Sequence, residues 1–310
     1  MLQNTFLVAR QAAILFVLMG AGGLAAKAGW LSRDGAKQMT NIVFYFATPC
    51  VIIDSFLTAD FTPELVGGMA RTAVFAVIAH IAGILISLPV FRREQAERKS
   101  VYRMALTFSN CGFMGIPLAR GVLGTECVVY ISVYIAVFNL FAWTYGVSLF
   151  RPGKKLSVRS IFLNPGTTSL LVGLAVAALR FDPPDLVSEP IRLLSALNSP
   201  VAMMVLGYYL FTTSLRPQRG EGGMWAAVAV KLLVIPAAAL AVSYALGLSG
   251  LWLAAALILA AAPSATNVLL FAARFDGNTA LAARAVSYCT LLSMVTMPVL
   301  LGVALAINPV

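Results

Sequence analysis

Two clusters of polar and helix-breaking residues interrupt long apolar runs, and these are the positions at which the sequence could bind a ligand. The first cluster comprises Asn110, Gly112, Gly115 and Pro117. The second comprises Pro263, Ser264, Thr266 and Asn267. Proline lacks a backbone N–H and clashes with the carbonyl four residues earlier, and glycine unwinds easily, so both runs are expected to break. A helix that restarts after a break offers free N–H groups and partial positive charge, which suit an anion such as a carboxylate.

The composition around these clusters is that of a membrane protein. Of the 310 residues, 60% are hydrophobic and only 11% are charged, whereas soluble domains have about 25% charged residues. In hydrocarbon, each backbone group freed by a break costs several kcal/mol unless protein or water satisfies it. The breaks should therefore lie beside a cavity, as in secondary transporters. The alternative interpretation is a pair of proline-kinked helices that pack through small residues.

Ten apolar runs are long enough, or nearly so, to cross a bilayer as helices. We therefore expect an all-α polytopic membrane protein with short connections and no soluble domain. The first run is too long for a secretory signal and is counted as a span. The expected spans are 5–26, 37–57, 67–90, 101–123, 128–150, 161–180, 190–214, 224–247, 251–273 and 280–306.

The distribution of charge predicts the orientation. With the N-terminus outside, 17 of the 22 basic residues fall on one face, and most acidic residues outside the spans fall on the other. The basic face is expected to be cytoplasmic, which places both termini outside the cytoplasmic (inner) membrane. This pattern explains the net charge of +10 without a nucleic-acid partner.

The two halves of the chain resemble each other at an offset near 150 residues. Residues 23–25 and 173–175 both read Gly-Leu-Ala, and Pro49 matches Pro200. We expect residues 1–150 and 161–310 to form two five-helix repeats joined by a short cytoplasmic linker at 151–160. An odd number of spans gives the repeats opposite orientation, so the broken fourth and ninth helices should cross near the midplane.

Five ionisable residues in or near the spans are further candidates for charge or proton coupling: Asp54, His80, Arg120, Lys231 and Arg274. Asp54 could bind a proton or could simply face water at the interface. Arg120 and Arg274 could attract an anion from either side, or could snorkel to the surface. Lys231 could snorkel or, if buried, act as a counter-charge. His80 could relay protons or serve as a packing residue.

Other classes of site are disfavoured. One histidine excludes a histidine-rich metal site, and the four cysteines show no ligand spacing. An intramembrane enzyme would need a constellation of nucleophile and base, paired acids or metal ligands that the spans lack. We expect no cofactor.

The motifs resemble those of the auxin efflux carrier family, whose plant members are the PIN-formed carriers. The fourth-span pattern Asn-x-Gly-x-x-Gly-x-Pro matches residues 110–117, and the fifth-span pattern matches Asn139, Trp143 and Gly146. Pro200, Gly207 and Pro263 match the family's seventh and ninth spans. The similarity covers residues 5–306, and the short central loop resembles that of compact, bacterial-type members.

This resemblance implies that the ten helices form two groups with different roles. Helices 1, 2, 6 and 7 would form a scaffold that dimerises, and helices 3–5 and 8–10 a transport domain that moves like an elevator. The crossover residues, with Asn139, would bind an organic acid such as malate, malonate or an auxin-like acid. A proton is the more natural coupling ion. A sodium-coupled symporter of the bile-acid type and a sensor that binds an organic acid without moving it remain as alternatives.

Overall fold

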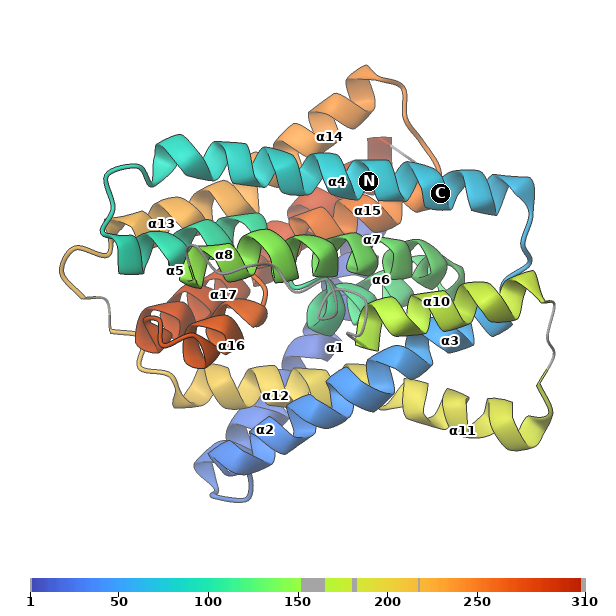
Figure 1. Cartoon of the computed structure of the whole chain (residues 1–310), viewed down its shortest axis with the longest axis horizontal. Coiled ribbons are helices and arrows are strands. Elements are labelled where there is room, and N and C mark those ends of the chain that lie inside the picture. Colours follow the sequence, from blue (N-terminus) through green and yellow to red (C-terminus); the bar gives the residue numbers. More distant parts are fainter. Residues whose placement is uncertain (1, 152–164, 180–182, 217, 308–310) are drawn as a thin grey trace.

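The computed structural model describes residues 2–151, 165–179, 183–216 and 218–307, and these fold almost entirely as helices (Figure 1). Six helical stretches are long and apolar enough to cross a membrane, which confirms the prediction of an all-helical, multi-pass membrane protein. They are Arg33–Leu57, Pro63–Val90, Thr125–Phe150, Asp185–Thr212, Gly222–Ala245 and Thr279–Ala304. Shorter apolar helices are Ala13–Lys27, Cys111–Leu123, Pro165–Ala178 and Leu251–Ala261.

The first half of the chain forms the elements α1 to α8. In order they are α1 (Leu2–Lys27), α2 (Arg33–Ile42), η1 (Val43–Ala47), α3 (Thr48–Leu57), α4 (Pro63–Val90), α5 (Ala96–Thr107), η2 (Cys111–Gly115), α6 (Ile116–Leu123), η3 (Thr125–Cys127), α7 (Val128–Phe141), η4 (Ala142–Gly146) and α8 (Val147–Phe150). The expected fourth span thus begins five residues earlier than predicted and is split in two. Nearly all of the predicted linker at 151–160 lies outside the described residues.

The second half forms the elements α10 to α17. They are α10 (Pro165–Ala178), α11 (Asp185–Ala196), α12 (Asn198–Thr212), α13 (Gly222–Ala229), η5 (Val230–Val234), α14 (Ile235–Ala245), α15 (Leu251–Ala261), α16 (Asn267–Arg274) and α17 (Thr279–Ile307). The expected ninth span is the second one to be split, between α15 and α16.

Proline explains the local geometry of three of the four π turns in the described residues. The turns η1, η2 and η5 each end two residues before a proline, at Pro49, Pro117 and Pro236. The proline ring clashes with the carbonyl four residues earlier, which lies inside the π turn in each case. Widening the turn relieves that clash and lets the helix continue, and such turns are frequent at functional sites.

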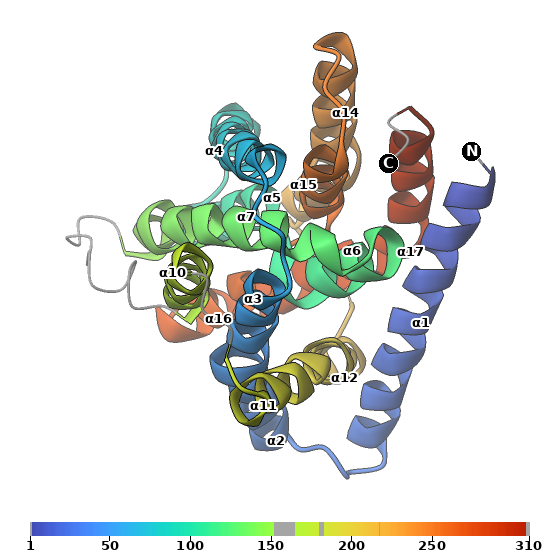
Figure 2. The same cartoon turned by 90° about the vertical axis from the view of Figure 1, so that its right-hand side faces the viewer.

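Glycine sets the closest helix contact, the seam between α1 and α12. A Cβ built on Gly207 would lie 1.8 Å from the carbonyl oxygen of Met19, and one on Gly22 would lie 2.0 Å from that of Met204. Only residues without side chains allow two backbones to approach this closely. Figure 2 shows α1 running along one side of the molecule, beside α17 and the end of α12.

Glycines also receive aromatic rings, both at this seam and in the helix pair α3 and α10. Gly23 of α1 faces the ring of Phe211 at the end of α12, and Gly173 of α10 faces the ring of Phe56 on α3. In each pair a glycine of one half of the chain receives an aromatic ring of the other half. The predicted spans 1 and 7, and likewise 6 and 2, therefore pack on each other.

The core of the molecule surrounds the two split spans. All residues of α15 from Trp252 to Ala261 are buried, as is most of α7. By contrast, α4 buries only one stripe and exposes apolar side chains such as Val74, Ile78 and Leu85. The exposed side of α4 is therefore suited to lipid, and the breaks lie inside protein, where their backbone groups can find partners.

Candidate functional site

The two breaks lie against each other as a pair of short extended segments. Ser109 and Ser264 form an antiparallel bridge. The Asn110 N–H donates to the Pro263 carbonyl at 2.7 Å, and the Ala265 N–H donates to the Phe108 carbonyl at 2.9 Å. Each broken helix therefore satisfies backbone groups of the other. The breaks in the expected fourth and ninth spans are thus joined by hydrogen bonds, and we call this arrangement the crossover.

The carbonyl ends of the first half-helices are capped at the crossover. The Ser264 hydroxyl donates to the Ala105 carbonyl at 2.7 Å, near the end of α5. The Lys231 ammonium donates to the Ala260 carbonyl at 3.3 Å, near the end of α15, and also to the Ser109 hydroxyl. These bonds replace helical ones that the breaks remove, because the last carbonyls of a helix have no intrahelical donor.

The amino ends of the second half-helices face a small cavity of about 60 Å³. Here η2 begins at Cys111 and α16 begins at Asn267, so free N–H groups and partial positive charge are directed toward it. That volume holds several waters or a carboxylate-sized group. Its lining is Phe44, Thr48, Ser109, Asn110, Cys111, Gly112, Phe113, Ile135, Phe138, Asn139, Gly166, Ala265, Thr266 and Asn267.

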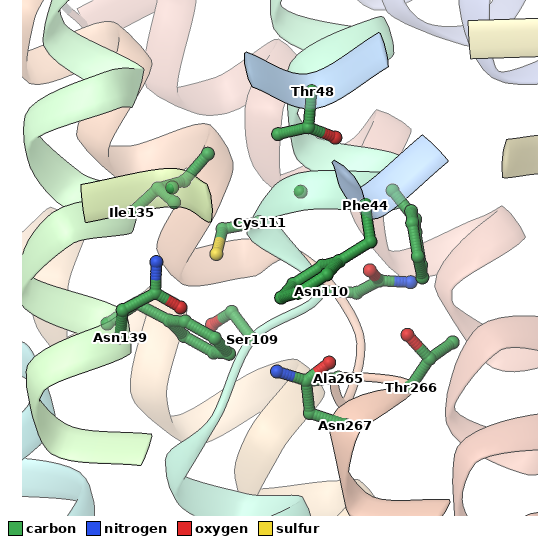
Figure 3. A pocket seen from close by; sticks show the side chains of 14 residues that line it. Phe44, Thr48, Ser109, Asn110, Cys111, Ile135, Asn139, Ala265, Thr266 and Asn267 are labelled. Carbon is green, nitrogen blue, oxygen red and sulfur yellow. The ribbon is translucent and has the colours of Figure 1, made fainter. Parts of the chain in front are cut away.

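Three carboxamides surround this cavity, contributed by Asn110 directly before η2, by α7 and by α16 (Figure 3). Asn110 is 3% exposed, and its Nδ2 has no hydrogen-bond acceptor among the described residues. A buried amide donor without a partner costs about 1–3 kcal/mol, so a ligand that accepts its hydrogen bond recovers that energy. Asn139 is also buried, and Asn267 is half-buried.

The opposite wall of the cavity comes from the helix pair α3 and α10. Phe44 lies in the π turn before α3, Thr48 begins α3 and Gly166 lies in the first turn of α10. The Thr48 hydroxyl accepts a hydrogen bond from the Asn198 amide at 2.8 Å, which links α3 to the start of α12. The site is thus a junction between the crossover and helices outside it.

The structure sorts the candidate site residues into two groups. Those that line the cavity are Asn110, Gly112, Asn139, Thr266 and Asn267. Gly115, Pro117, Pro263 and Ser264 do not line it. Gly115 packs on Leu259, Pro117 begins α6, Pro263 accepts the Asn110 N–H, and Ser264 caps α5. These four residues build the crossover that presents the others.

The ionisable candidates all lie outside the cavity lining. Asp54 is half-buried near the end of α3, Arg120 is half-buried near the end of α6, and Arg274 is exposed at the end of α16. Neither arginine lines the cavity, and their predicted role in attracting an anion stays a prediction. Of the two alternatives weighed for Lys231, snorkelling to the surface is wrong, because the side chain is 1% exposed.

His80 is buried in an aromatic cluster next to the crossover. Its Nδ1 lies 2.7 Å from the Ala76 carbonyl, and its ring stacks on Phe141 with centroids 5.1 Å apart. The ring centroid of Phe108, the residue before Ser109, lies 5.7 Å from that of His80. His80 Nε2 has no partner among the described residues. The geometry is that of a packing residue on α4 that supports Phe108.

Sequence reasoning missed several residues of the site. Ser109 is adjacent to Asn110 and could have been included as part of the break. Phe44 and Thr48 precede Pro49, which the repeat had singled out, so proximity to that proline was the available signal. Nothing in the sequence pairs Asn198 with Thr48, because that contact depends on how the two halves pack.

The comparisons with known proteins agree with this architecture. The model of the membrane transport protein family matches residues 7–301. An uncharacterized transporter of Methanothermobacter thermautotrophicus is 25% identical over 92% of this chain and 94% of its own length. An uncharacterized transporter of Methanocaldococcus jannaschii is 24% identical over 74% of this chain and 77% of its own. A Rhizobium meliloti protein named "Putative malonate transporter" is 27% identical over 61% and 59%.

A multi-pass helical protein with crossed, broken helices around a polar cavity has the architecture of a membrane transporter. With a family match that spans nearly all of its length, this chain belongs to the membrane transport protein family, the auxin efflux carrier family that its motifs resemble.

Proposed function

We propose that this protein is a secondary active transporter of small organic anions and that the cavity at the crossover is its substrate site. The observation that carries the proposal is Asn110 Nδ2, a buried donor with no acceptor among the described residues, at the start of a half-helix that faces the cavity. A carboxylate supplies the missing acceptor and interacts favourably with the partial positive charge of both half-helix starts. The name of the Rhizobium meliloti relative agrees with a small dicarboxylate as substrate.

The rest of the lining supports an anion with a small apolar part. Among the described residues no acidic or basic side chain lines the cavity, so binding relies on carboxamides, hydroxyls and backbone N–H groups. Phe44, Ile135 and Phe138 supply an apolar surface. Malonate, malate or an auxin-like acid matches these features in chemical class. The same three carboxamides can fix the orientation of a carboxylate through directional hydrogen bonds.

Alternating access follows from a division of the helices into two bodies. We assign α1, α2–α3, α10 and α11–α12 to a scaffold, and the remaining helices to a transport domain that carries the crossover. The reciprocal contacts Gly23–Phe211 and Gly173–Phe56 support two five-helix repeats of opposite orientation, because each joins equivalent spans of the two halves. The cavity lies between these bodies, with Thr48 on one side and Asn110 on the other. An elevator movement would carry the site past α3 and α10.

Orientation, assembly and coupling complete the proposal. The basic loops place the cytoplasm on the side opposite both termini, in the cytoplasmic membrane. The scaffold helices are the proposed dimer contact. A proton, or the membrane potential alone, is the proposed driving force. A sodium-coupled symporter and a sensor without flux are the competing outcomes of the experiments below.

The charge of the substrate can be tested with Asn110→Asp, which keeps the shape of the side chain and adds a negative charge. We expect the purified variant to lose binding of malonate and malate by more than 100-fold in Kd, because a carboxylate would face the substrate. Asn110→Ala removes one hydrogen bond to a charged group and should weaken binding roughly 10- to 100-fold. Asn267→Ala should behave similarly.

Isothermal titration measures these affinities, and thermal unfolding confirms that each variant folds. Asn41→Ala, at an exposed position of α2, is the matched control and should bind as the wild type does. Tight binding of dicarboxylates to Asn110→Asp would overturn the proposed site.

Transport itself requires flux measurements in proteoliposomes. Counterflow of radiolabelled mono- and dicarboxylates, at two pH values and with or without sodium, separates the remaining outcomes. We expect accumulation of one acid that a pH gradient enhances and sodium leaves unchanged. Binding without flux would make the protein a sensor, and flux only in sodium would make it a sodium symporter.

A further inference from the structure

The most unusual charged group in the described part of the chain is Lys231. Its side chain is 1% exposed and lies in the π turn η5, which precedes Pro236. From there the ammonium reaches the crossover and donates to the Ser109 hydroxyl and the Ala260 carbonyl. It therefore contacts both breaks at once, and it does so outside the cavity lining.

The Ala260 carbonyl is left without a helical donor by the break. In a continuous helix it would accept from the Ser264 N–H, which instead donates to Cys289 Sγ at 3.2 Å. The last carbonyls of α15 carry partial negative charge, and the ammonium neutralises it. Backbone carbonyls at the ends of broken half-helices, together with a hydroxyl, are the ligands that transporters commonly offer to a small cation.

No carboxylate balances Lys231 in the described residues. The two ion pairs found there join Arg192 to Glu189 and Arg284 to Glu221, at other places in the fold. A buried ammonium without an acidic partner is costly, so its charge must be held by the dipoles of the crossover. The arrangement therefore has opposite polarity on its two sides, with a cation at the carbonyl ends and a cavity for an anion at the amino ends.

We propose that the Lys231 ammonium is a tethered cation that occupies a cation site between Ser109 and the end of α15. Its removal should open this site to a free monovalent cation. The inference rests on the proposed function in one respect, namely that the crossover carries the substrate. It makes Lys231 a positioning residue, which acts on the cavity through Ser109, the only residue that both contacts the ammonium and lines the cavity in the described structure.

The test uses the purified full chain and Lys231→Ser, which removes the ammonium and leaves space. Thermal unfolding is measured at constant ionic strength in choline chloride and then with sodium, potassium, lithium, ammonium or methylammonium. The wild type should have the same melting temperature in all of these salts. Lys231→Ser should melt several degrees lower in choline, and at least one small cation should raise its melting temperature by about 3 °C or more in a saturable way.

Two further variants separate charge from packing. Lys231→Met keeps the apolar stem and fills the space, so it should be destabilised and should respond to no cation. Lys231→Gln can donate to the same two oxygens without charge, and it remains available if Lys231→Ser does not fold. It should melt between the wild type and Lys231→Met. Lys37→Ser, at an exposed position of α2, is the control for loss of a lysine elsewhere and should match the wild type.

The result that overturns the proposal is a destabilised Lys231→Ser that no cation restores, or a Lys231→Gln that equals the wild type in both stability and flux. Because unfolding is measured without substrate, the outcome is independent of the anion assignment. If cations restore the melting temperature of Lys231→Ser but the protein binds no carboxylate, the tethered cation is retained and the proposed substrate is rejected.

Discussion

The seam between α1 and α12 and the crossover both bring two helical spans into backbone contact, but they do so in opposite ways. At the seam, Gly22 and Gly207 remove side chains so that the backbones of two intact helices touch. At the crossover the helices are broken and exchange hydrogen bonds between Asn110 and Pro263 and between Ala265 and Phe108. The seam joins unbroken helices, whereas at the crossover the Asn110 Nδ2, beside a cavity, has no acceptor among the described residues. Close packing fixes the seam, and incomplete hydrogen bonding prepares the crossover to bind a ligand.

The largest expected effect lies at the seam. Gly207→Leu should prevent folding, because a Cβ would lie 1.8 Å from the Met19 carbonyl and neither backbone can move aside. The measurement is the yield of monodisperse protein after detergent extraction. Gly20→Ala, where a Cβ would meet no atom within 4 Å, is the control and should be recovered normally. Recovery of folded Gly207→Leu would mean that the seam is not rigid.

A smaller effect is expected at the cap of α5, and it separates a structural hydroxyl from a binding one. Ser264→Ala removes the donor to the Ala105 carbonyl and leaves that carbonyl buried without this partner. We expect a loss of about 1–3 kcal/mol in stability, seen as a lower melting temperature, with substrate Kd changed less than about threefold.

Ser249→Ala, at an exposed position between α14 and α15, controls for loss of a serine and should melt as the wild type does. A large loss of affinity in Ser264→Ala without loss of stability would return Ser264 to the binding site.

The smallest effect belongs to the basic loop between α4 and α5. Arg92→Glu combined with Arg93→Glu should leave the substrate Kd of purified protein unchanged, because both side chains are exposed and contribute to orientation. Titration with the acid identified by counterflow measures this. An altered affinity would show that the loop takes part in binding.

The sequence was most informative where local chemistry decides the structure. Long apolar runs located the spans, and Pro117 and Pro263 located the breaks, because a proline disturbs its own helix whatever surrounds it. Asn110 and Asn267 were placed correctly at the cavity because each sits at the start of a half-helix.

The features of the site that could not be predicted from the sequence depend on contacts between distant segments. Lys231 and Ser109 are 122 residues apart in the sequence, and Ser264 and Ala105 are 159 residues apart. No local pattern encodes either of these hydrogen bonds. For the same reason the hydrogen bond from the Ser264 hydroxyl to the Ala105 carbonyl was not predicted, and Thr48 of the opposite wall was overlooked. The buried pair of Glu221 and Arg284 was hidden because Arg284 was counted only as an orientation charge.

The placement of two cysteines gives the molecule a built-in chemical reporter. Cys111 lines the cavity and is 2% exposed, and Cys289 accepts the Ser264 N–H on the other side of the crossover. In the conformation described here a thiol reagent dissolved in water meets neither sulfur readily. A movement that opens the cavity to one side of the membrane would expose Cys111, because this residue lines the cavity. The rate at which this thiol is alkylated, with and without a carboxylate, therefore records the opening of the site without any label being added.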